Sequence, residues 1–266
     1  MARSLWRGSL SFGLVNVPVA LFSAVRDLDV HFNQLHADTG ARLEVKRVCK
    51  KGDHDVPYEE IGYGYELDSG KNKGKEVVLT QEELDAAQPE KTRTIDIDEF
   101  VDVADIDPVL YDHPYFLVPD ETGEGPARAY RLLVEVMEKE ERAAIGRLVL
   151  RTKEHLVAIL VRDGLLQATT MAFADELRPT GDLDLPTKKN APKPKELRNA
   201  VALIEELSRD FDPDRYKDCH RERLLAIIKR KSKGETIEAP AEPETPKAVP
   251  DLLAALERSL EEVRAR

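Results

Sequence analysis

Residues 6–19 form an apolar run that contains two glycines and has a proline near its end. Gly13 and Pro18 interrupt any helix through this run, and its β-branched residues alternate around Asn16. The pattern therefore predicts a β-strand that extends to Phe22. A strand of this kind is typical of a barrel or a sandwich.

The 266 residues, of which 41% are hydrophobic, suffice for one large domain with a real core, or for one domain plus an appendage. No apolar run approaches the roughly 18 residues of a membrane span, and the first residues lack the pattern of a signal peptide. We therefore expect a cytoplasmic protein without a membrane partner. Cys49 and Cys219 are the only cysteines, which fits a reducing compartment.

The net charge of −11 would repel a polyanion if it were evenly spread. It is concentrated instead, because residues 80–125 hold 14 Asp and Glu against 2 Lys and Arg. Residues 126–234 hold 23 Lys and Arg against 18 Asp and Glu, and residues 1–79 are neutral. An acidic composition therefore does not exclude a basic surface or channel.

The pattern after the first strand predicts an extended excursion over residues 26–77, with a hairpin tip near its three closely spaced lysines. Thr80 and Glu83 have the spacing of a capping box, which predicts a short helix over 81–88. Tyr130, Leu133, Val134 and Met137 form one apolar stripe of a helix over 127–142. Strands that could close a small barrel are predicted at 94–100, 109–111, 115–118, 145–151, 156–161 and 165–173.

Two further helical patterns follow, one over 197–207 and one that begins at Asp212-Pro213 and runs through Ile228. Residues 235–249 are rich in proline and glutamate, the composition of an extended linker that could reach roughly 50 Å. An amphipathic helix is predicted over 250–266, and it is too short to be stable alone. Its apolar face consists of Leu252, Leu253, Leu256 and Leu260.

The candidate motifs for catalysis and cofactor binding do not match the patterns that these functions require. Residues 64–71 resemble a phosphate loop, but five residues separate the glycines where four are required, and Asn72 replaces the hydroxyl that would hold magnesium. Neither Cys49 with His54 nor Cys219 with His220 has the spacing of a structural zinc site. The sequence therefore predicts no cofactor, no metal and no catalytic residue.

Several strings resemble segments of the bacterial Ku family, in the same order and at plausible intervals. The opening run has the form Trp-x-Gly-x-Leu-Ser-Phe-Gly-Leu-Val-x-Val-Pro-Val, and the resemblance extends over nearly the whole chain. The later strings are Val56-Pro57-Tyr58, Gly64-Tyr65-Glu66, residues 94–101, Ile106-Asp107-Pro108, residues 115–119, residues 174–178, residues 211–218 and residues 249–257.

The resemblance implies an α+β, mainly β fold: a Ku-type (SPOC-like) β-barrel with an inserted bridge that encircles DNA, followed by C-terminal helices. It implies a core over 1–234, with the bridge at about 26–77 and the helical end at about 195–233. It also implies a homodimeric ring that threads onto double-stranded DNA ends without reading bases. In this family the ring protects ends and recruits DNA ligase D for non-homologous end joining, and the leucines of residues 250–266 are the candidate docking face.

A ring of this kind holds phosphates with Lys and Arg, so its affinity depends on salt and not on sequence. The candidate DNA-binding residues are the cations of the bridge-like excursion and those around the strand after the central helix. They are Arg26, Arg42, Lys46, Arg47, Lys50, Lys51, Lys71, Lys73, Lys75, Arg147, Arg151 and Lys153. Tyr63 stands where family members often carry a lysine, which removes one possible cation from the bridge.

Two other classes of function remain open from the sequence. The first is an acidic protein-interaction module whose C-terminal helix binds a partner without any DNA. The second is a nuclease that acts on DNA ends through Asp96, Asp98 and a divalent metal. Duplex affinity at low salt would exclude the first, and metal-dependent loss of substrate would identify the second.

Overall fold

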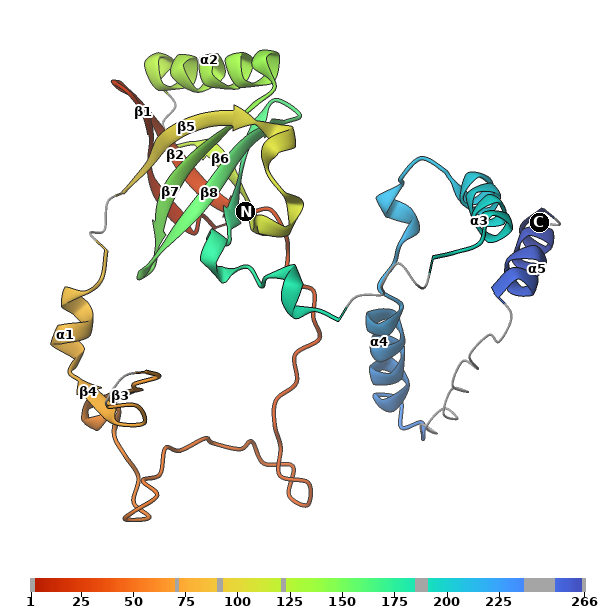
Figure 1. Ribbon diagram of the computed structural model, residues 1–266. Helices are drawn as coiled ribbons and strands as arrows, with labels where there is room; N and C mark the ends of the chain where they lie inside the picture. Colours follow the sequence, from red (N-terminus) through yellow and green to blue (C-terminus); the bar gives the residue numbers. More distant parts are fainter. Residues whose placement is uncertain are drawn as a thin grey trace. The chain divides into compact units, whose positions relative to one another are not determined.

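The computed structural model describes residues 3–69, 72–89, 93–120, 123–184, 191–236 and 252–264 (Figure 1). It divides into two compact units, one made of residues 1–27 and 33–178 and the other of residues 28–32 and 179–266. The predicted linker over 235–249 lies almost wholly outside the described residues. No helix within the described ranges combines the length and the apolar character that crossing a membrane requires.

The first unit contains nine strands and two helices among its described residues. The strands are β1 (Trp6–Phe12), β2 (Val15–Ser23), β3 (Tyr63–Glu66), β4 (Glu76–Leu79), β5 (Thr94–Asp102), β6 (Tyr111–Pro119), β7 (Arg142–Leu150), β8 (Lys153–Arg162) and β9 (Leu165–Met171). The helices are α1 (Gln81–Ala86) and α2 (Glu124–Glu140), and the second unit carries α3 (Pro194–Leu207), α4 (Cys219–Lys231) and α5 (Leu252–Arg264).

Seven of these strands form a closed barrel in the order β1-β2-β6-β9-β8-β7-β5, which confirms the predicted barrel. All neighbours are antiparallel except β1 and β5, whose parallel pairing closes the ring. The barrel core is aliphatic because inward side chains alternate with outward ones along each strand. Its fully buried large side chains include Leu10, Val17, Val19, Leu21, Ile95, Leu117, Leu148, Val157, Ile159 and Leu166.

The opening run forms a hairpin, not the single strand that its pattern predicted. A two-residue turn at Gly13 and Leu14 separates β1 from β2, and Gly13 has the positive φ that such a turn needs. Within β1, the Trp6 ring lies across Gly8, where a Cβ would stand 2.4 Å from it. A Cβ at Gly8 would also stand 2.1 Å from the carbonyl oxygen of Arg93, so a larger residue would require the backbone to move.

Helix α2 packs on the barrel through the stripe that the sequence predicted, since Tyr130, Leu133, Val134 and Met137 are all buried. The Tyr130 hydroxyl donates to the carbonyl of Leu117 at 2.8 Å and accepts from the amide of Leu166 at 3.0 Å. It therefore joins α2 to β6 and β9. Burial raises the pKa of Tyr130, so this hydroxyl keeps its proton.

Two further predicted elements differ from the structure. Of the strand predicted at 109–111, only Tyr111 is in a strand, because a 3₁₀ helix at Pro108–Leu110 leads into the single strand β6. The helix expected at Asp212-Pro213 begins later, since Asp212 caps a 3₁₀ helix at Pro213–Arg215. Helix α4 starts only at Cys219, where the Asp218 carboxylate accepts from the amide of Arg221.

The excursion between β2 and β5 has no core of its own. No described residue from 24 to 93 is buried, and Figure 1 draws this stretch as a long loop whose two ends join the barrel. It contains the β3–β4 hairpin and α1, whose capping box is present as predicted between Thr80 and Glu83. Its side chains are therefore displayed to solvent or to a ligand.

The second unit is helical, and no described residue in it is buried. Its helices are amphipathic, so apolar side chains remain open on their surfaces. On α3, Leu197, Val201, Ile204 and Leu207 are 51–65% exposed. These four residues therefore form an exposed apolar stripe along α3.

Candidate nucleic-acid interface

The middle of the excursion carries four of the predicted cations on a tight turn. An isolated β-bridge between Val48 and Asp55 holds the two arms of the turn together, and Asp53 takes a positive φ at its tip. Lys50 and Lys51 are exposed at this tip. Lys46 lies on one arm and forms an ion pair with Asp55 at 2.7 Å.

Arg47 connects this turn to the next part of the excursion through two tyrosines. Its guanidinium lies over the Tyr58 ring, 5.8 Å from the centroid. The hydrogen bond to Tyr58 is the main cause that raises the pKa of the Tyr63 hydroxyl in β3. Arg47 is thus held beside two exposed aromatic rings. This arrangement is suited to binding a phosphate and the sugar next to it in a nucleic-acid backbone.

The β3–β4 hairpin supplies the second group of cations. Lys73 and Lys75 are exposed on the turn between the strands, and the amide of Leu67 donates to the carbonyl of Lys75 at 3.1 Å. Lys71 lies outside the described residues. Arg26 and Arg42 are exposed nearer the start of the excursion, and Arg42 pairs through its backbone with Leu35 in a second isolated bridge.

The three cations predicted around the strand after the central helix lie on the outside of the barrel. Arg147 in β7 forms an ion pair with Asp98 at 3.3 Å, and Lys153 in β8 approaches Glu176 at 3.7 Å. Arg151 is exposed in the turn between these strands and has a positive φ. Two of the three are therefore partly neutralised, whereas Lys50 and Lys51 at the excursion tip have no ion pair with any described residue.

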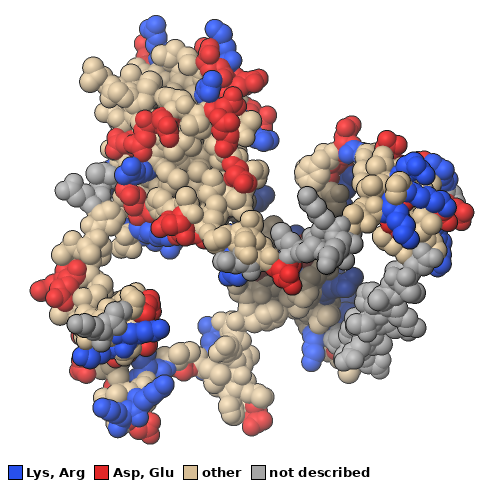
Figure 2. Space-filling model, in the orientation of Figure 1, with Lys and Arg blue, Asp and Glu red and all other residues tan. Residues whose placement is uncertain are grey.

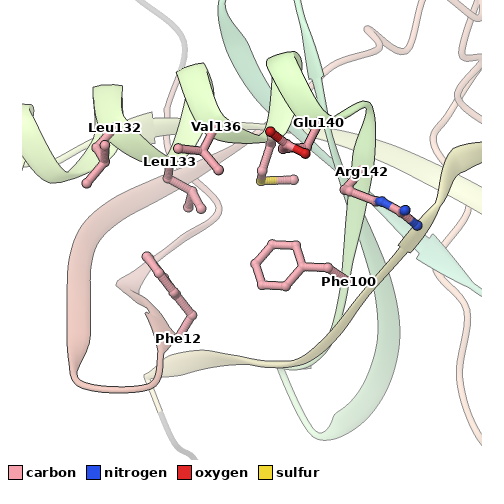
Figure 3. Close-up of a pocket in the computed structure, with 8 residues that line it drawn as sticks. Phe12, Phe100, Leu132, Leu133, Val136, Glu140 and Arg142 are labelled. Atoms are coloured by element: carbon pink, nitrogen blue, oxygen red, sulfur yellow. The ribbon is translucent and has the colours of Figure 1, made fainter.

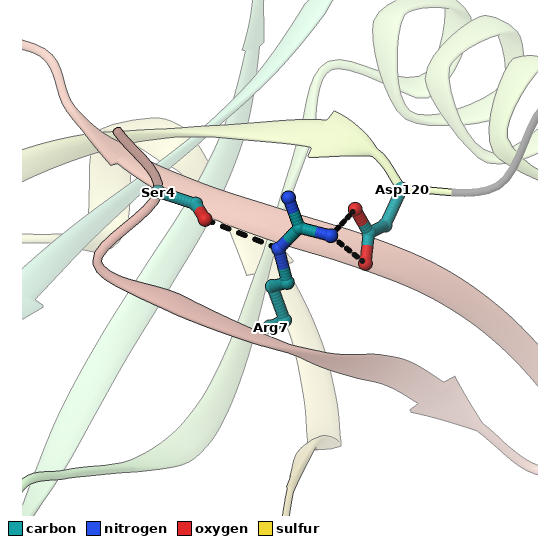
Figure 4. Close-up of polar contacts among 3 residues, drawn as sticks. All are labelled: Ser4, Arg7 and Asp120. Carbon is teal, nitrogen blue, oxygen red and sulfur yellow. Dashed lines mark hydrogen bonds and ion pairs between the residues drawn. The ribbon is translucent and has the colours of Figure 1, made fainter. Parts of the chain in front are cut away.

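Charge is distributed unevenly over the first unit (Figure 2). On the face shown, Asp and Glu prevail on the barrel, whereas Lys and Arg gather on the excursion around residues 46–51 and 73–75. Where the barrel carries a cation, an acid is often beside it. Arg7 in β1 donates to Ser4 at 3.2 Å and pairs with Asp120 at 3.1 Å (Figure 4).

The acids proposed for the nuclease alternative lie on β5. Asp98 is engaged by Arg147, and Asp96 is opposite Arg147 in the β5–β7 register. Within the described ranges, no three His, Cys, Asp or Glu side chains are grouped so that they could hold a metal ion. Exposed cations, and not a cluster of ligands, are the chemical feature that this surface offers.

A pocket of about 370 Å³ lies between α2 and the barrel (Figure 3). Phe12 and Phe100 meet edge to face across it at 6.5 Å, and Arg142 and Glu140 are its only charged lining residues. Its walls are otherwise aliphatic or thioether side chains of α2. The pocket can hold an apolar group, but it has no polar array that would bind a nucleotide.

The predicted partner-binding leucines lie on one side of α5. Leu253, Leu256 and Leu260 are half-buried, whereas Leu252 is 56% exposed. Helix α5 packs along α3 in the same unit. Leu253, Leu256 and Leu260 therefore lie on the more buried side of a helix that packs on α3, whereas Leu252 stays open.

Sequence reasoning missed two groups of residues. Tyr58 and Asp55 contact predicted cations, but an isolated tyrosine or aspartate gives no signal before the excursion folds. The basic side chains of α4 could have been found from their density, and Arg230 among them pairs with Glu235 at 2.8 Å. The other exposed cations of that helix and its flanks are Lys217, Arg223, Lys229, Lys231 and Lys233.

Comparisons with known proteins agree with this architecture. The family model for the Ku70/Ku80 beta-barrel domain matches residues 11–199. A Non-homologous end joining protein Ku of Anaeromyxobacter sp. (strain K) is 43% identical over 267 residues, which covers 100% of this chain and 88% of the relative. The protein of the same name from Mycobacterium tuberculosis is 37% identical, over 97% of this chain and 94% of the relative. The chain therefore belongs to the Ku family.

Proposed function

We propose that this protein binds the ends of double-stranded DNA, independently of sequence, in double-strand break repair by non-homologous end joining. The observation that carries the proposal is the unburied, cation-bearing excursion between β2 and β5 of a Ku barrel. Exposed Lys and Arg bind phosphates of any sequence, and they give an affinity that falls steeply with salt. The relatives named above are non-homologous end joining proteins, which supports the same role here.

Two copies of the chain form the ring in this proposal. The support is the uncovered apolar stripe of α3, with Leu197, Val201 and Ile204, in a unit without a single buried residue among those described. A second copy offers the partner that such a unit needs. Paired excursions would then surround the duplex, so that only a free end could enter.

The C-terminal helix recruits DNA ligase D in this proposal, through Leu252, Leu253, Leu256 and Leu260. An amphipathic helix of 13 residues presents anchors at helical spacing, as helices that bind in a groove do. The protein itself contributes binding and protection, and the ligase contributes the chemistry. Action on chromosomal breaks would place it in the cytoplasm, at the nucleoid.

The experiment that tests end binding compares linear duplex DNA with the same DNA as a relaxed closed circle. Binding is measured without metal over a salt series, with two unrelated sequences. We expect stable binding to the linear form alone and no dependence on sequence. Equal binding to both forms would indicate an ordinary groove binder, and no binding at low salt would leave the interaction-module alternative.

The dimer is tested by light scattering of the double variant Val201→Glu, Ile204→Glu. We expect a dimer for the parent chain and a monomer for the variant, with loss of stable binding to linear DNA. Arg198→Glu is the matched control, because it changes charge on α3 outside the apolar stripe. A variant that stays dimeric would remove α3 from the interface.

A further inference from the structure

Helix α5 lies along α3 (Figure 1), and two ion pairs join the helices. Lys195 Nζ is 2.9 Å from Glu257 Oε1, and Arg264 Nε donates to Glu206 Oε1 at 3.0 Å. Lys195 is in the first turn of α3 and Glu206 is in its last. The two pairs therefore join the middle and the last turn of α5 to the first and last turns of α3, with the two helices running in the same direction.

The face of α5 that these pairs turn toward α3 is the leucine face. Leu253 lies four residues before Glu257, and Leu260 lies four residues before Arg264. All four side chains therefore share one side of the helix. On α3, Leu203 lies three residues before Glu206 and is its neighbour on the helix surface. Leu203, Leu253 and Leu260 are all half-buried, as packing between the two helices requires.

This contact leaves the other face of α3 open. Leu197, Val201 and Ile204 point away from the side that carries Lys195 and Glu206, and they are 51–65% exposed. The stripe assigned above to a second copy and the surface that α5 covers are therefore different. Helix α5 can leave α3 without disturbing the stripe.

We propose that α3 is an autoinhibitory surface that holds the partner-binding face of α5 closed until a partner displaces it. The inference rests on the proposed partner function of α5. The half-buried Leu253, Leu256 and Leu260 cannot pack within the chain and on a partner at once, so partner binding must compete with the internal contact. The apparent affinity for the partner is then reduced by the fraction of chains in which α5 is released.

The internal contact is suited to reversible release. Its ion pairs are exposed, and exposed pairs stabilise a contact only weakly and are screened by salt. A 13-residue helix is also marginal in isolation, so α5 is ordered chiefly by the surface on which it packs. A partner with a deeper apolar groove would therefore bind these leucines more tightly and displace α5 from α3.

The test opens the contact from α3, so that α5 keeps its own sequence. The variant is Lys195→Glu, Leu203→Asp, Glu206→Lys in the full-length chain, and Arg198→Glu is the control on a different side of α3. Hydrogen exchange of residues 252–264 is measured first, followed by titration with purified DNA ligase D. We expect protection of α5 in the parent and control to be lost in the variant. We expect the variant to bind the ligase about 3- to 10-fold more tightly.

A second variant checks that the effect comes from the contact and not from unfolding of α3. Lys195→Glu alone should reduce protection of α5, and Lys195→Glu with Glu257→Lys should restore it, because the pair is rebuilt with reversed sign. Circular dichroism should show that the released variants lose no more helix than the 13 residues of α5 account for, so that α3 itself stays folded. Failure of the reversed pair to restore protection would count against the geometry described here.

The outcomes separate this inference from the function on which it rests. Helix α5 that exchanges as fast in the parent as in the variant would overturn the closed state. A protected α5 with equal ligase affinity in parent and variant would overturn autoinhibition alone. Loss of protection in the variant, with no ligase binding by either chain, would overturn the partner assignment and with it the inhibitory role, while the α3–α5 contact would stand.

Discussion

The barrel and the excursion that interrupts it are stabilised in opposite ways. In the barrel, each of the seven strands contributes at least one fully buried side chain, and α2 adds four more buried side chains. In residues 24–93, no described side chain is buried, and turns, isolated bridges and one hairpin give the order. The difference teaches that one region carries the stability of the fold, whereas the other displays charge.

The separation has a functional logic. Phosphate-binding cations must stay hydrated and exposed until DNA arrives, and a region with a packed core would bury part of them. Stability can then be supplied by the barrel, at which both ends of the excursion are anchored. Variants in the two regions should therefore affect different measurements.

The largest effect on stability is expected from Gly146→Ala in the barrel. A Cβ at Gly146 would stand 2.3 Å from the carbonyl oxygen of Asp96, where β5 has a bulge. Backbone must move to admit it, so the free energy of unfolding should fall by about 3 kcal/mol in urea denaturation. Gly64→Ala in β3 is the matched control, since its nearest neighbour is the Glu76 side chain at 3.6 Å. Equal losses of unfolding free energy in both variants would contradict the view that the barrel, and not the excursion, carries the stability of the fold.

The next effect is expected from Tyr130→Phe. The variant leaves the amide of Leu166 and the carbonyl of Leu117 without their buried partner, which costs about 2 kcal/mol of unfolding free energy. Tyr65→Phe in the excursion removes only an exposed hydrogen bond to Asp68 and should cost less than about 0.5 kcal/mol. Thermal melts of both variants measure the difference, and DNA affinity should be unchanged in Tyr130→Phe.

Variants of the excursion should change DNA binding and leave the stability of the fold unchanged. The triple reversal Arg42→Glu, Lys46→Glu, Arg47→Glu should weaken linear duplex binding by about tenfold or more. It should also flatten the slope of log affinity against log salt by about 3. Its melting temperature should stay near that of the parent, because no buried residue changes. Unchanged affinity and slope would remove these three cations from the site.

The control for this reversal changes the same charges on the barrel. Arg128, Arg131 and Lys139 are exposed on α2, and their reversal to Glu alters net charge equally. We expect a much smaller change in affinity and in salt slope. A loss equal to that of the excursion variant would mean that net charge, and not the position of the cations, governs binding.

The smallest effect is expected from Asp55→Asn, which frees Lys46 from its ion pair at 2.7 Å. A released ammonium should strengthen duplex binding about 2- to 3-fold at low salt, and the gain should vanish as salt screens it. Asp53→Asn removes the same charge two residues earlier, and asparagine tolerates the positive φ found there. The two variants would bind alike if Lys46 made no phosphate contact.

Local signals in the sequence predicted the elements that depend on local physics. The stripe of Tyr130, Leu133, Val134 and Met137 predicted α2 and its buried face, because helical periodicity needs no knowledge of the partner surface. The capping box of Thr80 and Glu83 was confirmed for the same reason. The opening run was predicted as one strand because the turn at Gly13 and Leu14 is only two residues long.

The candidate site was predictable only as a set of cations on the excursion. The sequence could not distinguish Lys50, at an exposed tip, from Arg147, which shares its charge with Asp98 across two strands. The contacts of Arg47 with Tyr58 and of Lys46 with Asp55 also depend on the path of the chain between them. Ion pairs between residues distant in sequence require the folded register before they can be assigned.

By itself, the sequence determined the family, the alternation that makes barrel strands and the amphipathic faces of α2, α3 and α5, since these depend on residue order alone. Only the tertiary structure decided which cations remain available, because neutralisation depends on which acid the barrel or a turn places within about 4 Å. It also decided that the leucines of α5 meet α3. The sequences of α3 and α5 each predict an apolar face, but only the packing of the folded chain determines which surface covers that face.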